Sequence, residues 1–125
     1  MYIAVDFDGT VVTHEYPYVG KDIGAVPVLK KLVENNHNII LFTMRDEKEL
    51  EDAIKWFKDN DIPLFGINDN PDAKWSSSRK VFANIYIDDM ALGVPLKYDY
   101  NFSDRCFVDW EKVNIWLKNA GIINE

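Results

Sequence analysis

The chain has 125 residues, 47% of them hydrophobic and 28% charged, a composition typical of one globular domain. Lys and Arg number 14 and Asp and Glu number 21, and the resulting net charge of −7 argues against broad binding of nucleic acids or anionic membranes, while leaving room for a local basic pocket. No apolar stretch reaches the ~20 residues of a membrane span, and no signal-peptide pattern opens the chain. The single cysteine, Cys106, has no partner for an internal disulfide. We therefore expect a cytoplasmic protein.

The first half of the chain predicts two buried strands separated by a loop and a helix. The apolar run Ile3–Phe7 indicates the first strand. A loop rich in His, Tyr, Pro and Gly follows over Val11–Gly24 and is too short for a further domain. Apolar residues at helical spacing predict a helix over Ala25–Asn35, and the apolar run Ile39–Phe42 predicts a second strand that ends at Thr43.

The second half continues this alternation of helices and strands. The clearest helix is predicted over Asp46–Lys58, and short strands are predicted over Leu64–Ile67 and Asn84–Ile87. Between these strands lies a polar, turn-rich segment, Asn68–Ser78. The last helix is predicted over Asp109–Asn119, with an inward-facing stripe of Trp110, Val113, Trp116 and Leu117.

Buried strands that alternate with helices indicate a mainly parallel sheet covered on both faces. We therefore expect residues 1–125 to form a single three-layer, Rossmann-like α/β domain. Polar side chains directly follow three of the predicted strands, namely Asp6 and Asp8, Thr43, and Asp88 with Asp89. Because parallel strands end at one edge of the sheet, where ligands bind in open α/β folds, we expect these side chains to form one site.

Three carboxylates gathered at one edge need a compensating charge. Two unit charges ~5 Å apart repel by about 3 kcal/mol at an effective dielectric constant near 20. A divalent cation between Asp6, Asp8 and Asp88 removes this cost. Oxygen ligands without His or Cys favour a hard ion, and Mg²⁺ suits a site that also takes phosphate, so Mg²⁺ is the expected cofactor.

The same residues suit hydrolysis at phosphorus. A carboxylate can attack phosphorus and form an aspartyl-phosphate. The reaction then needs an acid for the leaving oxygen and later a base for water, and Asp8 lies on the same side of an extended chain as Asp6. Thr43 is the candidate hydrogen-bond donor to the phosphate, and Lys80 is the candidate second cation.

Four segments resemble, in the same order, the four motifs of the haloacid dehalogenase-like (HAD) hydrolase superfamily. Asp6–Thr10, with the sequence DFDGT, looks like the first motif, and Leu41–Thr43 looks like the second. Lys80 resembles the lysine of the third motif, and Ile85–Asp89, with the sequence IYIDD, resembles the fourth. The four motifs span residues 6 to 89, about two-thirds of the chain.

The resemblance implies a role for each matched position. Asp6 would be the nucleophile and a Mg²⁺ ligand, and Asp8 the general acid and base with its backbone carbonyl on the metal. Thr43 would hold the phosphoryl group and Lys80 would neutralise it. Asp88 and Asp89 would complete the metal site. An Asp at position 8 is the phosphatase form of the motif, because dehalogenases of the family lack this second acid.

The resemblance departs from the family pattern in two places. Lys80 lies only eight residues before Asp88, so Lys74 or Arg79 are alternative cations. The two usual positions of a cap domain are too short to hold one, which makes the chain similar to small capless HAD proteins of bacteria and phages, whose SRK…IDD segment matches Ser78–Asp89.

The expected function is therefore a Mg²⁺-dependent phosphomonoester hydrolase that acts on a phosphorylated substrate. Two alternatives remain open: a catalytically silent module that binds phosphate and Mg²⁺, and a phosphatase for polynucleotide ends or proteins. Thr10 and Arg45 are further candidates for contacts with substrate. Without a cap, we expect the open site to be covered by the Val11–Gly24 loop or by a second copy of the chain.

Overall fold

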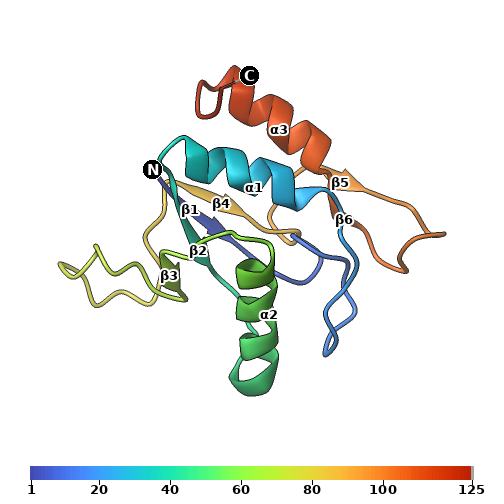
Figure 1. Ribbon diagram of the computed structural model, residues 1–125, viewed down its shortest axis with the longest axis horizontal. Helices are drawn as coiled ribbons and strands as arrows, with labels where there is room; N and C mark the ends of the chain where they lie inside the picture. Colours follow the sequence, from blue (N-terminus) through green and yellow to red (C-terminus); the bar gives the residue numbers. More distant parts are fainter. Residues whose placement is uncertain (125) are drawn as a thin grey trace.

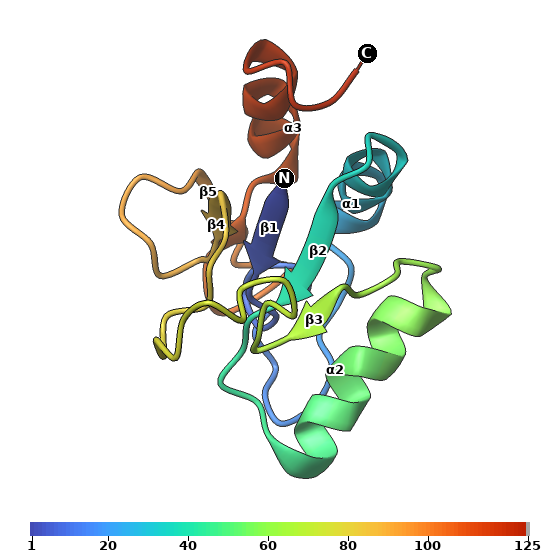
Figure 2. The same ribbon diagram turned by 90° about the vertical axis from the view of Figure 1, so that its left-hand side faces the viewer.

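A four-stranded, entirely parallel sheet forms the centre of the molecule. The computed structural model describes residues 1–124. The strand order is β3-β2-β1-β4, and the strands are β1 (Tyr2–Val5), β2 (Asn38–Leu41), β3 (Gly66–Ile67) and β4 (Ile85–Ile87). Val5 is paired with Leu41 on one side and with Ile87 on the other, so these strands end level with one another. Figure 2 shows β1 and β2 side by side and pointing the same way.

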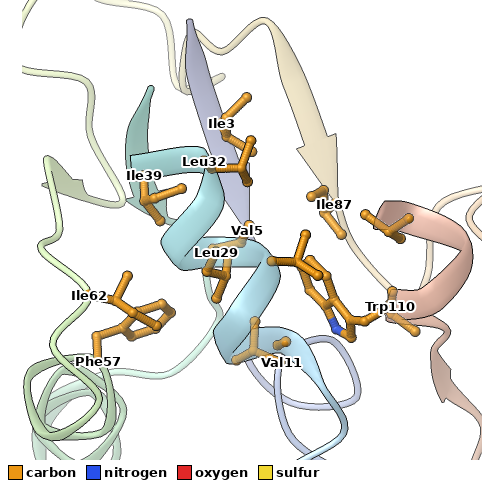
Figure 3. Close-up of a cluster of buried hydrophobic side chains, with 14 of the residues drawn as sticks. Ile3, Val5, Val11, Leu29, Leu32, Ile39, Phe57, Ile62, Ile87 and Trp110 are labelled. Carbon is orange, nitrogen blue, oxygen red and sulfur yellow. The ribbon is translucent and has the colours of Figure 1, made fainter. Parts of the chain in front are cut away.

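One face of the sheet packs against the helices, which are α1 (Ala25–Glu34), α2 (Glu47–Asp59) and α3 (Trp110–Asn119). Side chains alternate between faces along a strand, so Ile3 and Val5 point to the same side. They share a buried cluster with Leu29 of α1, Phe57 of α2 and Trp110 of α3. Figure 3 shows these side chains converging around α1. Burial of this apolar surface is the main force that holds the helical layer on the sheet.

The second face is covered by irregular chain rather than by a helix. The connections β1–α1–β2 and β2–α2–β3 move in one direction along the sheet, whereas the return from β3 to β4 runs the opposite way and therefore crosses the other face. Ala4 and Ile40 are buried on this face. The ring of Tyr2 packs against the rings of Phe65 and Phe82, with ring centroids 5.7 Å apart in both pairs. Figure 1 shows the segment between β3 and β4 in yellow-green at the left, apart from the helices.

The structure confirms the predicted three-layer α/β fold with a central parallel sheet and no cap domain inserted in residues 1–124. The helical stripe predicted for α3 is wrong at Trp116, which is 58% exposed because it lies about 120° round the helix from Trp110 and about 100° from Leu117. A small hairpin, β5 (Leu96–Lys97) with β6 (Phe107–Val108), was not predicted. Within the described residues, no helix combines the length and apolar character needed to cross a bilayer.

Candidate active site

The carboxyl ends of β1, β2 and β4 bring the predicted site residues to one edge of the sheet. Asp6 follows β1 directly, and its backbone N–H donates to the carbonyl of Ile87 at 3.0 Å. Asp88 follows β4 directly, and Thr43 lies two residues beyond β2. Parallel register alone therefore brings together residues that are up to 82 positions apart in the chain.

Asp6, Asp88 and Asp89 form a half-buried acidic cluster. One carboxylate oxygen from each lies within 4.8 Å of the others. Burial raises the pKa of Asp6 to about 8, and the charges of Asp88 and Asp89 add to the rise. Burial also raises the pKa of Asp89. Three acids held this close in a partly dry site favour either a shared proton or a bound cation.

Thr10 holds the acidic cluster in place through hydrogen bonds. Its side chain is completely buried. Its hydroxyl lies 3.2 Å from an Asp6 oxygen and 3.3 Å from an Asp89 oxygen, and it accepts a hydrogen bond from the Asp89 backbone N–H at 3.0 Å. Thr10 therefore orients the acids, and its expected contact with substrate stays a prediction that the burial of its hydroxyl does not support.

Gly9 allows Asp89 to approach the first motif closely. Its φ is +77°, and a Cβ atom at this position would lie 2.4 Å from Oδ2 of Asp89. Any side chain here would push Asp89 away and would strain the backbone. The glycine of the DFDGT sequence is thus needed for the geometry of the acidic cluster.

Asp8 is held apart from the cluster by Arg45. Nε and Nη2 of Arg45 donate to the two oxygens of Asp8, both at 2.8 Å. Burial alone lowers the pKa of Arg45, but the hydrogen bonds and charge of Asp8 outweigh this effect and raise it. The Asp8 carboxylate is therefore not one of the three clustered groups, and the prediction that Asp8 joins the metal ligands finds no support from its side chain.

Arg45 is part of the protein framework rather than a free contact for substrate. It is only 3% exposed, and its remaining hydrogen bonds reach the carbonyls of Glu49 and Tyr18 at 3.0 and 2.8 Å. Its guanidinium also stacks over the rings of Phe7 and Tyr16. Its donors are directed at Asp8 and at the two backbone carbonyls, although Arg45 also lines the acidic cavity, so its expected contact with substrate stays a prediction.

Thr43 faces the cavity that contains the acids. Its backbone N–H donates to Oδ1 of Asn68 at 2.8 Å, and its hydroxyl accepts from the backbone N–H of Arg45 at 3.1 Å. Within residues 1–124 the hydroxyl donates to no protein acceptor, so its hydrogen is free for a ligand. The cavity has a volume of about 410 Å³ and is lined by Asp6, Asp8, Thr43 and Asp89 together with other side chains.

Lys80 does not line this cavity. Its side chain lies over the ring of Tyr86, with Nζ 5.5 Å from the ring centre, in a separate cavity on the second face of the sheet. Arg79 lines that second cavity as well. The segment before β4 is irregular and contains a local turn in which the Lys80 backbone N–H donates to Oγ of Ser78. The structure therefore separates Lys80 from the acids that it was predicted to join.

Arg105 is a second cation, beside Arg45, in the lining of the acidic cavity, and sequence reasoning missed it. It lines the cavity with His14, Tyr16, Met44 and Met90. One of its guanidinium nitrogens lies 3.3 and 3.4 Å from the two ring nitrogens of His14. In the described chain its side chain is paired with no carboxylate, unlike that of Arg45.

The chain resembles a solved structure over nearly its whole length. A structure described as the conserved protein coded by a locus from Bacteroides thetaiotaomicron shares 34% sequence identity and a TM-score of 0.79, covering 96% of this chain and 91% of that one. The chain belongs to the same family as this protein. No protein-family model and no curated protein matches the chain.

The hairpin of β5 and β6 carries the cation that sequence reasoning missed. β6 is tied to the first motif because the Val108 N–H donates to the carbonyl of Gly9 at 3.0 Å. The hairpin then places Arg105 opposite His14. A lone arginine in an irregular segment carries no sequence signal for this position, and the two-residue strands that flank it are too short to give a clear pattern.

Proposed function

We propose that the protein is a Mg²⁺-dependent phosphomonoester hydrolase of the HAD type that acts through an aspartyl-phosphate on Asp6. The observation that carries the proposal is the cavity in which Asp6 and Asp89 of the acidic cluster adjoin Asp8 and Thr43. These are the residue types that the chemistry needs, and they come from the ends of three parallel strands. The resemblance of four ordered segments to the HAD motifs supports the same conclusion.

The donor set fits Mg²⁺. Oxygen ligands of Mg²⁺ lie ~2.1 Å from the ion, so opposite ligands are ~4.2 Å apart. The oxygens of Asp6, Asp88 and Asp89 lie within 4.8 Å of one another. Adjacent ligands are ~3 Å apart, so the three carboxylates would have to close further around the ion. The ion, when bound, would neutralise the carboxylates and polarise a phosphate oxygen. It would also hold Asp6 ionised, since the pKa of this group is otherwise raised to about 8.

Asp6 supplies the attacking oxygen. A bond forms between an Asp6 carboxylate oxygen and phosphorus while the ester P–O bond breaks, and the leaving oxygen takes a proton from Asp8. Asp8 then takes a proton from water, which attacks phosphorus and releases inorganic phosphate from Asp6. Because both Asp8 oxygens accept from Arg45, Asp8 must exchange one of these hydrogen bonds for each transfer.

Two further side chains are suited to bind the phosphate. The free hydroxyl hydrogen of Thr43 can donate to a phosphoryl oxygen. Arg105 supplies positive charge to the same cavity. Lys80 lies outside this cavity, so we assign the neutralising role to Arg105.

The direct test is hydrolysis of an aryl phosphate by wild type and Asp6→Asn. We expect Asp6→Asn to abolish turnover with an unchanged circular dichroism spectrum. EDTA should abolish hydrolysis by the wild type, and added Mg²⁺ should restore it. Undiminished turnover by Asp6→Asn would show that the nucleophile is assigned wrongly.

A second candidate function is a module that binds phosphate and Mg²⁺ without turnover. The bidentate Asp8–Arg45 pair favours it, because both oxygens of the proposed acid and base are engaged by Arg45. In that case Mg²⁺ would raise the melting temperature, but a broad panel of phosphate esters would remain intact. Turnover of any phosphate ester that depends on both Asp6 and Asp8 rules this second candidate out.

A further inference from the structure

A second cavity lies on the face of the sheet that has no helix. Its volume is about 520 Å³, within the range of small-molecule sites in proteins. It is enclosed by the irregular segment between β3 and β4 and by Tyr86 of β4. In Figure 1 this segment is the yellow-green chain at the left.

Aromatic rings are exposed along this cavity. Trp75 is 74% exposed, although its ring edge contacts Phe82 at a centroid distance of 5.8 Å. Phe82 and Tyr86 also keep more than a third of their surface in contact with solvent. A tryptophan that is held by a neighbouring ring and still presents most of its surface is suited to stack on a flat aromatic ligand.

The same cavity carries positive charge. Arg79 and Lys80 both line it, and within residues 1–124 neither lies within 4.0 Å of a carboxylate oxygen. Asp69 is the acidic residue in the lining. On a chain with a net charge of −7, two adjacent unpaired cations beside three aromatic rings form a local site for anions.

One hydrogen bond joins a residue that lines the second cavity to a residue that lines the acidic cavity. Asn68 lines the second cavity, and its Oδ1 accepts from the backbone N–H of Thr43, which lines the first. A ligand whose phosphate lies at Asp6 and Thr43 can therefore extend past Asn68 onto the aromatic and cationic surface. The group that enters the second cavity would be the leaving group of the hydrolysis.

We propose that this cavity binds the leaving group of the substrate, and that the substrate is a single-stranded nucleic acid with a terminal phosphate. The inference rests on the proposed function and adds the substrate class. Stacking of a base on Trp75 and pairing of backbone phosphates with Arg79 and Lys80 is the combination by which proteins bind single strands without sequence preference. A mononucleotide has only the phosphate that reacts and leaves the two cations unused.

Binding is tested separately from hydrolysis by using the full-length Asp6→Asn protein with Mg²⁺. The probe is a short single-stranded oligonucleotide with a terminal phosphate and a fluorescent label at the other end. In this background Trp75→Ala should weaken the affinity about tenfold or more. Trp116→Ala is the matched control, because Trp116 is also exposed but lies on α3, and it should leave the affinity unchanged.

The salt dependence tests the cations. In a plot of log K against log salt concentration, the phosphate contacts of Arg79 and Lys80 contribute about −1.4 to the slope, and Arg79→Ala should reduce the magnitude of the slope by about 0.7. In the active enzyme, Trp75→Ala should raise KM for the oligonucleotide with little change in kcat, whereas Trp116→Ala should leave both constants unchanged. This pair of results locates the effect in the leaving-group site and not in the chemistry.

Two outcomes would overturn the proposal while leaving the phosphatase assignment intact. One is an oligonucleotide affinity that Trp75→Ala and Trp116→Ala change equally. The other is a dimer in sedimentation experiments that Trp75→Ala dissociates without changing oligonucleotide affinity, since the aromatic surface would then be a contact between two copies of the chain.

Discussion

Asp8 and Arg45 form a buried ion pair in which both carboxylate oxygens accept hydrogen bonds of 2.8 Å from one guanidinium. Arg45 reaches Asp8 across 37 positions of sequence and also donates to the carbonyl of Tyr18 in the Val11–Gly24 loop. One side chain therefore connects the proposed acid and base to this loop, which lines the cavity through His14 and Tyr16.

Removing Arg45 should destabilise the protein strongly. Arg45→Ala leaves the buried Asp8 carboxylate without its partner, a change that costs about 3–5 kcal/mol in the free energy of unfolding. Urea denaturation measures the loss. Lys48→Ala is the matched control, because the Lys48–Asp52 pair lies on the surface and should shift the urea midpoint little. Equal midpoints for both variants would contradict the framework role of Arg45.

The stability of the metal-free protein should fall as the pH rises. The pKa of Asp6 is raised from 3.8 to about 8 in the folded state, so folding favours its protonated form. The contribution of Asp6 to the free energy of unfolding is complete below the pKa of the unfolded chain and is lost as the pH rises through the pKa of the folded protein. The free energy of unfolding should fall by a few kcal/mol, an order-of-magnitude figure, over this range. Urea unfolding in EDTA across this range measures it.

Asp6→Asn should flatten that pH profile, because the neutral amide replaces the group that titrates. Asp59→Asn, at the exposed end of α2, is the control and should keep the profile of the wild type. A profile that is the same in all three proteins would show that Asp6 is not the titrating group.

Magnesium should stabilise the fold through the acidic cluster. At a free concentration a hundredfold above Kd, an ion that binds only the folded state adds about 2.7 kcal/mol to the free energy of unfolding. Thermal melting should therefore show a Mg²⁺-dependent rise in Tm for the wild type and for Asp59→Asn. Asp88→Asn should lose most of this rise, because it removes one of the three clustered carboxylates. An unchanged Mg²⁺ response in Asp88→Asn would place the ion elsewhere.

Arg105 should matter more for phosphate binding than Lys80. Loss of a charge-assisted hydrogen bond costs about 1.5–3 kcal/mol, so Arg105→Ala should lower kcat/KM for an aryl phosphate about tenfold or more, mainly through KM. Arg105→Lys should restore part of the loss. Lys80→Ala serves as the comparison because Lys80 lies outside the acidic cavity. The reverse order of effects would return the neutralising role to Lys80.

The parallel sheet and the meeting of its carboxyl ends were predictable from sequence. Apolar runs located β1, β2 and β4, and parallel register then fixed where Asp6, Thr43 and Asp88 lie. The pairing of Asp8 with Arg45 was not predictable, because the direction of each side chain depends on packing in the folded state.

The sequence also left the cations of the site ambiguous. Lys80 matched a motif by its order in the chain, but it belongs to a local turn and its side chain lies over the ring of Tyr86. Arg105 reaches the cavity through a hairpin whose strands have two residues each, too few for a periodic pattern. Contacts that depend on irregular chain are therefore the part that sequence reasoning could not supply.

The absence of a helix between β3 and β4 has a consequence for how the family can diversify. None of the residues from 68 to 84 belongs to the main hydrophobic cluster beneath the helices. Changes of length or composition in this segment would leave that cluster untouched while reshaping the surface next to the reactive edge. The residues that stabilise the fold and the residues proposed to select the ligand thus lie on opposite faces of one sheet. Substitutions that alter specificity could therefore accumulate on one face with little loss of stability.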